Sequence, residues 1–266
     1  VVSESGVDAA DIVSLGISGQ MHGLVMLDEE CNVLRPSILW CDQRTGKECD
    51  ELTQKLGRET LIKITANPAL TGFTASKILW VKNNEPEIFD KCRHILLPKD
   101  YLRFRLTDEF ATEVSDASGM QLLDVPNRKW SSVMIEACGI KEEYLAKVYE
   151  SPEITGYINK ETSALTGLTT ATAVVGGAGD NAAAAVGMVQ NRGHPVDLVR
   201  AKQFRGIDIV GDYFVIIDFM PDTFGGALVN RNLITAASQE GLQFTGDFSI
   251  QQLISRANSN AAFWFR

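Results

Sequence analysis

A glycine-rich turn between two apolar runs constrains this chain more than any other segment. Residues 173–175 form a short apolar run typical of a buried strand. Residues 176–179 contain three glycines, which allow a sharp turn and close approach of a neighbouring backbone or ligand. Residues 181–188 are rich in alanine and favour a helix. The segment therefore predicts a strand, a tight turn and a helix, with Asp180 at or near the helix N-cap.

Asp180 is the only carboxylate of this segment. The free amides and the dipole at a helix N-terminus favour a charged group, so we expect Asp180 to be ionised at neutral pH and able to accept a proton. A simple capping role is the first alternative. A dinucleotide-binding oxidoreductase is the second, because residues 177–182 formally match G-x-G-x-x-A. Against the second, Asp180 would put a negative charge beside the pyrophosphate.

Composition narrows the classes of partner. The chain has 266 residues and a net charge of −9, with no Lys/Arg cluster, which argues against a nucleic-acid binder. No apolar run is long enough to cross a membrane. The five cysteines are odd in number and include no C-x-x-C pair, so neither a disulfide framework nor a zinc site is indicated. We therefore expect a globular protein of a reducing compartment, the cytoplasm.

Strand and helix patterns alternate along the chain, which predicts an α/β fold. The first three strands are joined by short turns and are expected to pair antiparallel. Apolar runs predict strands over residues 12–19, 22–27, 33–40, 94–97 and 154–158. Helical spacing predicts helices over residues 42–56, 74–83, 98–107 and 131–138, the third opened by Pro98 and the fourth closed by Gly139.

A second small-residue turn, over residues 18–23, presents Gln20, Met21 and His22 together. Gln20 and His22 can each donate and accept hydrogen bonds, and Met21 offers an apolar wall. The turn would suit a polyhydroxylated ligand, although a lone histidine in a loop is more often a solvated or capping residue than a ligand contact. Farther along, Asp42 and Arg44 are expected to form a surface ion pair.

Several stretches occur in the order in which they are found in the FGGY carbohydrate kinases, and the chain resembles that family, its xylulokinase group most closely. The resemblance runs from about Val13 to Met188. It is carried by six stretches: 16–23 (GISGQMHG), 39–45 (LWCDQRT), 71–84 (TGFTASKILWVKNN), 97–107 (LPKDYLRFRLT), 115–119 (SDASG) and 176–181 (GGAGDN). Ser76 and Cys41 depart from the proline and asparagine common in relatives.

The resemblance implies an actin-like, RNase H-type fold in two domains, with residues 1–175 in a sugar-binding domain and residues 176–266 at the start of a second. It implies transfer of the γ-phosphoryl group of ATP to D-xylulose, giving D-xylulose 5-phosphate, with Mg²⁺ neutralising the developing charge. Asp180 matches the catalytic base of the family.

Further site residues follow from the same resemblance. Met21 and His22 match the residues that hold the ketose, and Gln20 and Asn181 are expected to add sugar contacts. Gly177 and Gly179 are candidates for the approach of a phosphate, and no residue is identified for a metal. The expected partners are the ketose and ATP, with no nucleic acid and no membrane, and a homodimer is compatible with the sequence.

The resemblance is incomplete at both ends. The Asp-x-Gly-Thr phosphate loop expected before Val1 and the Gly-Thr-Ser-Gly loop expected after about residue 190 do not occur in this sequence. A sugar-binding fragment without catalytic activity is therefore kept as an alternative. In the remaining segment, residues 207–219 have the apolar, β-branched character of a strand and residues 248–257 have helical spacing.

Overall fold

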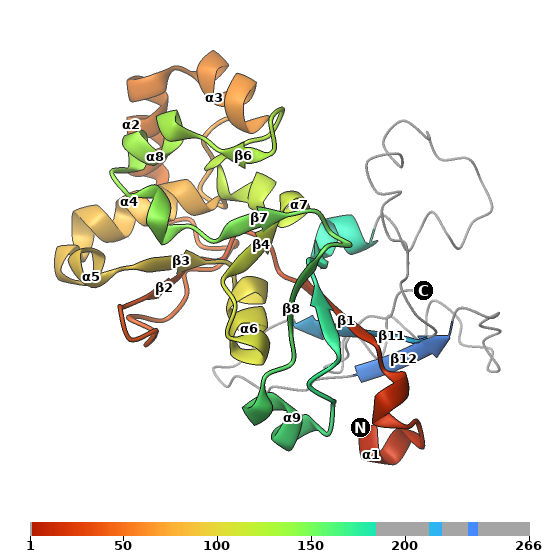
Figure 1. Ribbon diagram of the computed structural model, residues 1–266. Coiled ribbons are helices and arrows are strands. Elements are labelled where there is room, and N and C mark those ends of the chain that lie inside the picture. The colour runs from red at the N-terminus through yellow and green to blue at the C-terminus, as the bar shows by residue number, and fades with distance from the viewer. Residues whose placement is uncertain (1, 185–212, 220–233, 239–266) are drawn as a thin grey trace, which may run out of the picture. The chain divides into compact units, whose positions relative to one another are not determined.

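The computed structural model describes residues 2–184, 213–219 and 234–238 (Figure 1). Their contacts divide the chain into two compact units. Unit 1 comprises residues 1–19, 103–109 and 151–266, and unit 2 comprises residues 20–102 and 110–150. The predicted boundary at residues 175 and 176 falls inside unit 1, and the assignment of residues 176–266 to a second domain stays a prediction.

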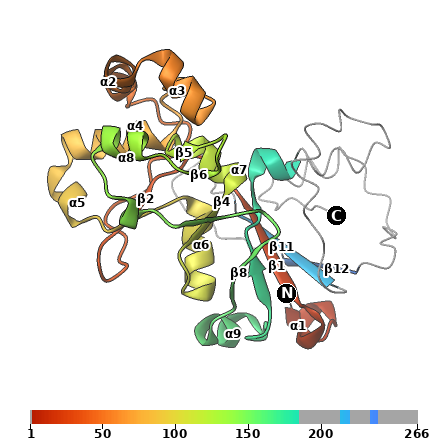
Figure 2. The same cartoon turned by 45° about the horizontal axis from the view of Figure 1, so that its top comes forward.

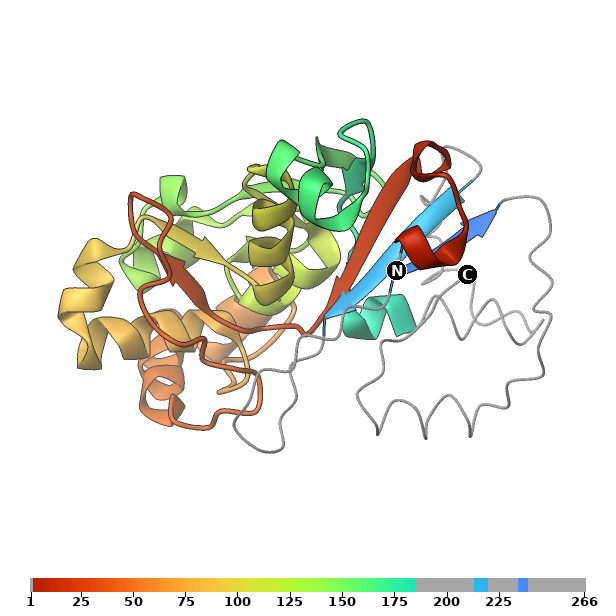
Figure 3. The same cartoon turned by 90° about the horizontal axis from the view of Figure 1, so that it is seen from below.

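Unit 1 is built on a six-stranded mixed sheet with the order β12-β11-β1-β9-β8, in which β10 also pairs with β1. Strand β1 is parallel to β9, β10 and β11, whereas β8 and β12 run antiparallel to their neighbours (Figure 3). The strands are β1 (Ser14–Gly19), β8 (Ile154–Tyr157), β9 (Ala173–Val175), β10 (Ala178–Gly179), β11 (Tyr213–Phe219) and β12 (Ile234–Ser238). All six residues of β1 are buried, as in a strand covered on both faces.

Among the described residues of unit 1, helical structure also lies outside the sheet. It includes α1 (Val2–Ser5), η1 (Ala9–Asp11), α9 (Lys160–Thr166) and the C-terminal part of α6 (Pro98–Thr107). Residues 180–184 are also helical. The predicted helix after the glycine turn is thus confirmed over residues 181–184, while residues 185–188 lie outside the described part of the chain.

The expected antiparallel pairing of the first three strands is confirmed only in part: residues 22–27 and 33–40 are joined by antiparallel bridges, whereas β1 pairs with neither segment. Strand β1 forms where predicted, but β2 (Val25–Leu27) pairs with β3 (His94–Leu96) in unit 2. Residues 33–40 contribute only single bridges, from Val33 and Ile38, to the β2 segment. Both edges of β1 are taken by β9, β10 and β11, so no edge is left for β2.

Unit 2 packs helices and short strand pairs around one apolar core, in which α4 is the most buried helix. Helices α2 and α8 both contact α4, and α5 follows it closely (Figure 2). The helices are α2 (Gly46–Leu56), α3 (Arg58–Thr65), α4 (Thr74–Asn84), α5 (Pro86–Lys91), the first half of α6, α7 (Val114–Ala117), η2 (Ser118–Met120), α8 (Ser132–Cys138) and η3 (Glu142–Tyr144). The remaining strands are β4 (Ala111–Glu113), β5 (Leu123–Asp124), β6 (Lys129–Trp130) and β7 (Lys147–Tyr149).

Helix ends in both units obey local rules that are visible in the sequence. Helix α6 begins at Pro98, whose missing N–H costs nothing at a first helical position. The Ser131 hydroxyl accepts a hydrogen bond from the Met134 amide at the start of α8, and Gly139 ends that helix at φ +66°. Both predicted ends of α8 are therefore confirmed.

The C-terminal segment is described only in part. Strand β11 occupies the end of the apolar run predicted over residues 207–219. The helix predicted over residues 248–257 lies outside the described residues.

Candidate sugar and phosphoryl-transfer site

His22 is the centre of a strained three-residue turn in unit 2. The Gly23 amide donates a hydrogen bond to the Met21 carbonyl at 2.9 Å, and His22 has φ +66°. This combination defines a γ-turn of the rarer, strained kind. Such backbone conformations persist only where surrounding contacts hold them, and they are concentrated at functional sites.

Helix α4 provides the contacts that hold the turn. The His22 carbonyl accepts hydrogen bonds from Lys77 Nζ at 2.8 Å and from Thr74 Oγ1 at 3.1 Å. Lys77 is fully buried, and its Nζ also donates to the Gly72 carbonyl just before the helix. One ammonium group therefore joins the His22 turn to the segment that leads into α4.

The imidazole of His22 is enclosed by two neighbours. Its ring lies 4.5 Å from that of Phe73, centroid to centroid, at an interplanar angle of 60°. A Cβ atom at Gly119 would lie 2.3 Å from His22 Cδ2 and Nε2, so only glycine leaves room for the ring. The FGGY-like stretches at residues 16–23, 71–84 and 115–119 thus meet at this imidazole.

The surroundings keep His22 neutral. Burial, together with the charge of Lys77, lowers the pKa of His22 to about 4. Burial also lowers the pKa of Lys77 to about 8, although Asp42 acts in the opposite direction. A neutral imidazole carries one donor and one acceptor nitrogen, which suits a hydroxyl group that does both.

Gln20 and Met21, which precede His22 in the chain, differ in their exposure. Gln20 is only 2% exposed, whereas Met21 and His22 are both partly exposed.

The predicted Asp42–Arg44 ion pair also lies in unit 2, with 2.8 Å between Nη2 and Oδ2. Both side chains retain solvent contact, and the Arg44 guanidinium lies 4.7 Å from the Trp80 ring centre. The ion pair is confirmed as a surface feature.

A buried ionic cluster lies elsewhere in unit 2. Lys99 Nζ is 3.0 Å from Asp100 Oδ1 and 3.5 Å from both Glu113 Oε1 and Asp116 Oδ2. All four side chains are at most 1% exposed. The carboxylate of Glu113 also accepts hydrogen bonds from the Ser115 and Asp116 amides, which caps α7. This cluster ties α6 to the 115–119 stretch that contacts His22.

The glycine turn that precedes Asp180 belongs to unit 1 and is a bulge in the sheet. Leu15 pairs with Val174 and Ser18 with Ala178, so the second strand holds one residue more than β1 between these pairs. Gly177 has φ +69°, and a Cβ atom there would lie 2.1 Å from the Ile17 carbonyl oxygen. The close approach observed at Gly177 is to the β1 backbone, and the approach of a phosphate stays a prediction.

A buried cation holds this turn as well. The guanidinium of Arg103, fully buried in α6, donates a hydrogen bond from Nη2 to the Gly176 carbonyl. On the other side, the amides of Gly176 and Gly177 donate to the carbonyls of Glu153 and Ser151 at 2.9 and 3.0 Å. The backbone before Asp180 is therefore fixed from two directions.

Asp180 itself is partly buried at the first helical position after β10. Burial raises the pKa of Asp180 above its ordinary value, and a 2.8 Å hydrogen bond from the Asn181 amide acts in the opposite direction. The net shift is thus opposite in direction to the effect expected of a helix N-terminus, and ionisation of Asp180 at neutral pH stays a prediction. Asn181, next in the chain, is exposed.

The predicted site residues thus form two groups, one in each unit. Gln20, Met21 and His22 belong to unit 2, while Gly177, Gly179, Asp180 and Asn181 belong to unit 1. Sequence reasoning did not assign a role to Lys77, Arg103 or Gly119. In the sequence, Lys77 is the single basic residue among the mostly apolar helical residues 75–81, and this pattern could have indicated a buried ammonium group.

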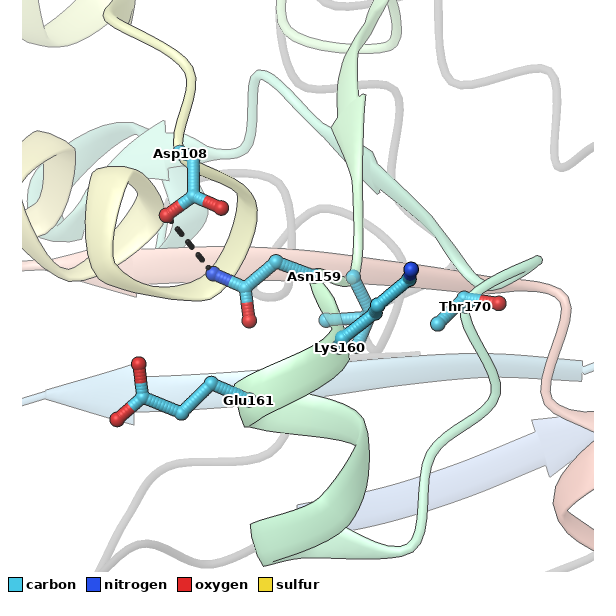
Figure 4. Close-up of a pocket in the computed structure, with 6 residues that line it drawn as sticks. Asp108, Asn159, Lys160, Glu161 and Thr170 are labelled. Carbon is cyan, nitrogen blue, oxygen red and sulfur yellow. Dashed lines mark hydrogen bonds between the residues drawn. The ribbon is translucent and has the colours of Figure 1, made fainter.

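A surface hollow of unit 1, about 440 Å³ in volume, is separate from all these residues. Asp108, Ile158, Asn159, Lys160, Glu161 and Thr170 line it (Figure 4). Asn159 donates a hydrogen bond to Asp108 at 3.0 Å, while the charged ends of Lys160 and Glu161 point in opposite directions. Ligand sites bring a few polar groups together, so this hollow lacks their usual arrangement.

The described residues contain neither a metal cluster nor a membrane helix. Within them, no group of three or more His, Cys, Asp and Glu side chains is arranged to hold a metal ion. In the same part of the chain, no helix combines the length and apolar character needed to cross a bilayer. All five cysteines lie within the described ranges, each as a free thiol.

Comparison with known proteins gives these two groups a context. The model of the FGGY family of carbohydrate kinases, N-terminal domain, matches residues 1–187. A xylulose kinase of Escherichia coli is 48% identical over 178 residues, which cover 67% of this chain and 36% of that protein. The chain thus spans about a third of the length of this curated relative.

Solved structures agree with the sequence relatives. A "xyloylose kinase" of Brucella ovis has 41% identity and a TM-score of 0.65, covering 68% of this chain and 37% of that one. A gluconate kinase of Lactobacillus acidophilus has 26% identity and a TM-score of 0.61, covering 64% of this chain and 35% of that one. The fold is shared among kinases of different sugars, whereas sequence identity is higher to these two xylulose kinases than to the gluconate kinase.

Proposed function

This chain belongs to the FGGY family of carbohydrate kinases, and we propose that it serves the transfer of the ATP γ-phosphoryl group to D-xylulose, giving D-xylulose 5-phosphate. The observation that carries the proposal is the neutral imidazole of His22, held in a strained turn by Lys77 and Thr74. A rigid group that both donates and accepts hydrogen bonds is suited to one hydroxyl of a ketose.

His22 and Met21 bind the ketose in this proposal, and Gln20 and Asn181 add contacts. His22 orients a sugar hydroxyl, and the partly exposed Met21 packs against the carbon chain. The identity of 48% to a xylulose kinase over 178 residues supports a ketose as the substrate.

Asp180 is the general base of the reaction. Its carboxylate takes the proton of the sugar hydroxyl while that oxygen bonds to the γ-phosphorus, and the bond from the γ-phosphorus to the bridging oxygen breaks to release ADP. The raised pKa of Asp180 makes its carboxylate a stronger base than an exposed aspartate. The anchored turn at Gly176 and Gly177 supports the required position of the carboxylate.

ATP is the phosphoryl donor in this proposal, and Mg²⁺ would bind with it. The described residues offer no group of three or more side chains arranged to bind a metal ion, so the proposal assigns no residue to Mg²⁺. The homodimer, the cytoplasmic location and the absence of nucleic-acid or membrane partners stay predictions from the sequence.

Replacement of Asp180 tests the proposal. We expect ADP formation from MgATP to depend on D-xylulose, and Asp180→Asn to lower its rate by about 10²-fold or more, the usual contribution of a general base. D-xylulose affinity, measured by calorimetry, should change less than about twofold, because the amide preserves the shape of the side chain. Asp108→Asn is the matched control, since it makes the same change at another carboxylate of unit 1.

Three outcomes separate the candidate functions. Turnover that is independent of D-xylulose, or equal in Asp180→Asn and the parent chain, contradicts the proposed mechanism. Binding of D-xylulose without turnover supports the sugar-binding fragment instead. Binding of NADH in place of the sugar would support the dinucleotide-binding alternative.

A further inference from the structure

We infer that Lys77 is a positioning residue for sugar binding: its buried ammonium holds the strained turn of His22 against α4 and thereby sets the direction of the imidazole. This inference rests on the proposed function, because it explains how the ketose contact of His22 is maintained. It concerns a residue that touches the turn rather than the substrate.

The backbone of His22 is in a strained conformation. A non-glycine residue in the left-handed region is strained, and a three-residue turn with φ near +66° is uncommon. A chain released from its contacts would leave this conformation, which would move the imidazole. Something in the fold must therefore stabilise it, and the His22 carbonyl is where the stabilising hydrogen bonds converge.

The ammonium group of Lys77 is placed to stabilise this turn. A fully buried ammonium is unfavourable unless its hydrogen bonds are made, and Lys77 makes them to two backbone carbonyls, those of His22 and Gly72. Charged donors form stronger hydrogen bonds than neutral ones. Lys77 therefore joins the turn to the residues just before α4, and Thr74, one helical turn earlier, adds a neutral donor.

The imidazole ring of His22 is enclosed by neighbouring residues. Phe73 and Gly119 confine the imidazole on two sides, so a small movement of the turn would bring it into collision or out of its pocket. Phe73, Thr74 and Lys77 belong to one short segment that includes the start of α4. The segment thus fixes both the backbone and the ring of His22.

The charge of Lys77 has a second effect on the same imidazole. The ammonium opposes protonation of His22, in addition to the larger effect of burial. Asp42 and Cys41 act on Lys77 itself and favour its charged form. Removal of Lys77 should therefore change two observables, the affinity for the sugar and the protonation of His22.

The experiment compares Lys77→Met with Lys82→Met. Both substitutions remove an ammonium from α4, but Lys82 is exposed and makes no contact with the His22 turn among the described interactions. We expect Lys77→Met to weaken D-xylulose binding by at least about tenfold and to raise the pKa of His22, read from ¹⁵N-histidine NMR spectra. The chain has three histidines, so the spectra are simple, and His22→Asn assigns the signal. Lys82→Met should change neither observable.

The NMR measurement separates this inference from the proposed function. A His22 signal that moves in Lys77→Met, in a chain that binds no D-xylulose, would overturn the function but support the role of Lys77 in the turn. An unchanged His22 signal together with a sugar affinity within about twofold of the parent would overturn the role of Lys77.

Two further variants decide the matter if Lys77→Met fails to fold. Lys77→Gln keeps one donor group without the charge, and Thr74→Val removes the second donor to the His22 carbonyl while keeping the side-chain shape. We expect each to shift the His22 signal and to weaken binding by about threefold. Folded variants with an unchanged signal would contradict the inference.

Discussion

Two buried cations determine the conformation of the two loops that carry the predicted site residues. Lys77 donates to the carbonyl of His22 in unit 2, and Arg103 donates to the carbonyl of Gly176 in unit 1. In both cases a charged donor from a helix binds a backbone carbonyl oxygen, and charged donors form stronger hydrogen bonds than neutral ones.

Burial also sets the protonation of the residues on these loops. It lowers the pKa of His22 and raises that of Asp180, which in each case favours the neutral form. A neutral imidazole suits hydroxyl binding, and a more basic carboxylate suits proton removal. The same physical effect therefore serves both proposed roles.

The titration of His22 leads to a prediction for stability. The pKa of His22 is lowered from its ordinary 6.5 to about 4 in the folded chain, so the unfolded chain binds a proton more readily between these values. We expect the folded state to lose stability as the pH falls from 6.5 toward 4, by at most about 3.5 kcal/mol at roughly 1.4 kcal/mol per pKa unit. Urea denaturation at about pH 7 and about pH 5 measures the part of this loss that falls above pH 5, about 2 kcal/mol.

His22→Asn is the matched variant for this measurement. Asparagine does not titrate and tolerates the left-handed conformation better than most residues. The loss of stability between the two pH values should be smaller in the variant than in the parent chain. Equal losses would show that His22 does not carry the pH dependence.

At the scale of elements, the bulge at Gly177 explains how one strand changes register along β1. Strands β9 and β10 both pair with β1, and the extra residue between them lies against the Ile17 carbonyl. Bulges redirect the backbone next to active sites. Here the bulge precedes Asp180 directly and so determines where the helix after it begins.

Substitution of Gly177 tests this role of the bulge. Gly177→Ala should destabilise the chain by about 3 kcal/mol or more, because left-handed strain of about 1–2 kcal/mol adds to the overlap with Ile17. Gly167→Ala should cost only the strain, since Gly167 has φ +81° and a Cβ atom there would meet no other atom within 4 Å. Urea denaturation of the two variants gives the difference, and equal losses would contradict the close approach to β1.

At the scale of the whole molecule, the reactivity of the cysteine thiols indicates whether unit 2 is folded. All five belong to that unit, and Cys49, Cys92 and Cys138 are buried whereas Cys31 and Cys41 retain exposure. Burial raises the pKa of Cys92 and of Cys138 to about 12. Thiolates are the reactive species, so the buried thiols should react only when the unit opens.

We therefore expect two of the five thiols to react rapidly with a disulfide reagent at about pH 8, and the other three at least about 100-fold more slowly. In concentrated urea all five should react at similar rates. A Cys31→Ser, Cys41→Ser double variant should lack the fast phase in the native state. A third fast thiol in the parent chain would contradict the buried core of unit 2.

Several features of the chain as a whole could be predicted from its sequence. The ends of α6 and α8 follow from Pro98, Ser131 and Gly139, because capping and proline effects involve only residues a few positions apart. The family follows from six short stretches, and the match of its model to residues 1–187 confirms it. The actin-like fold, implied by the same stretches, is confirmed by the solved relatives.

The amino-acid sequence by itself thus determined the local elements, the family and the residues to consider, Asp180 and His22 among them. Only the tertiary structure decided the partners of β1, the strained turn of His22, the anchoring by Lys77 and Arg103, and the direction of each pKa shift. Strand pairing joins residues far apart in the chain, such as Leu15 and Val215, and desolvation depends on every atom packed around a group. A local pattern of residues therefore predicts neither the strand pairing nor the desolvation of a group.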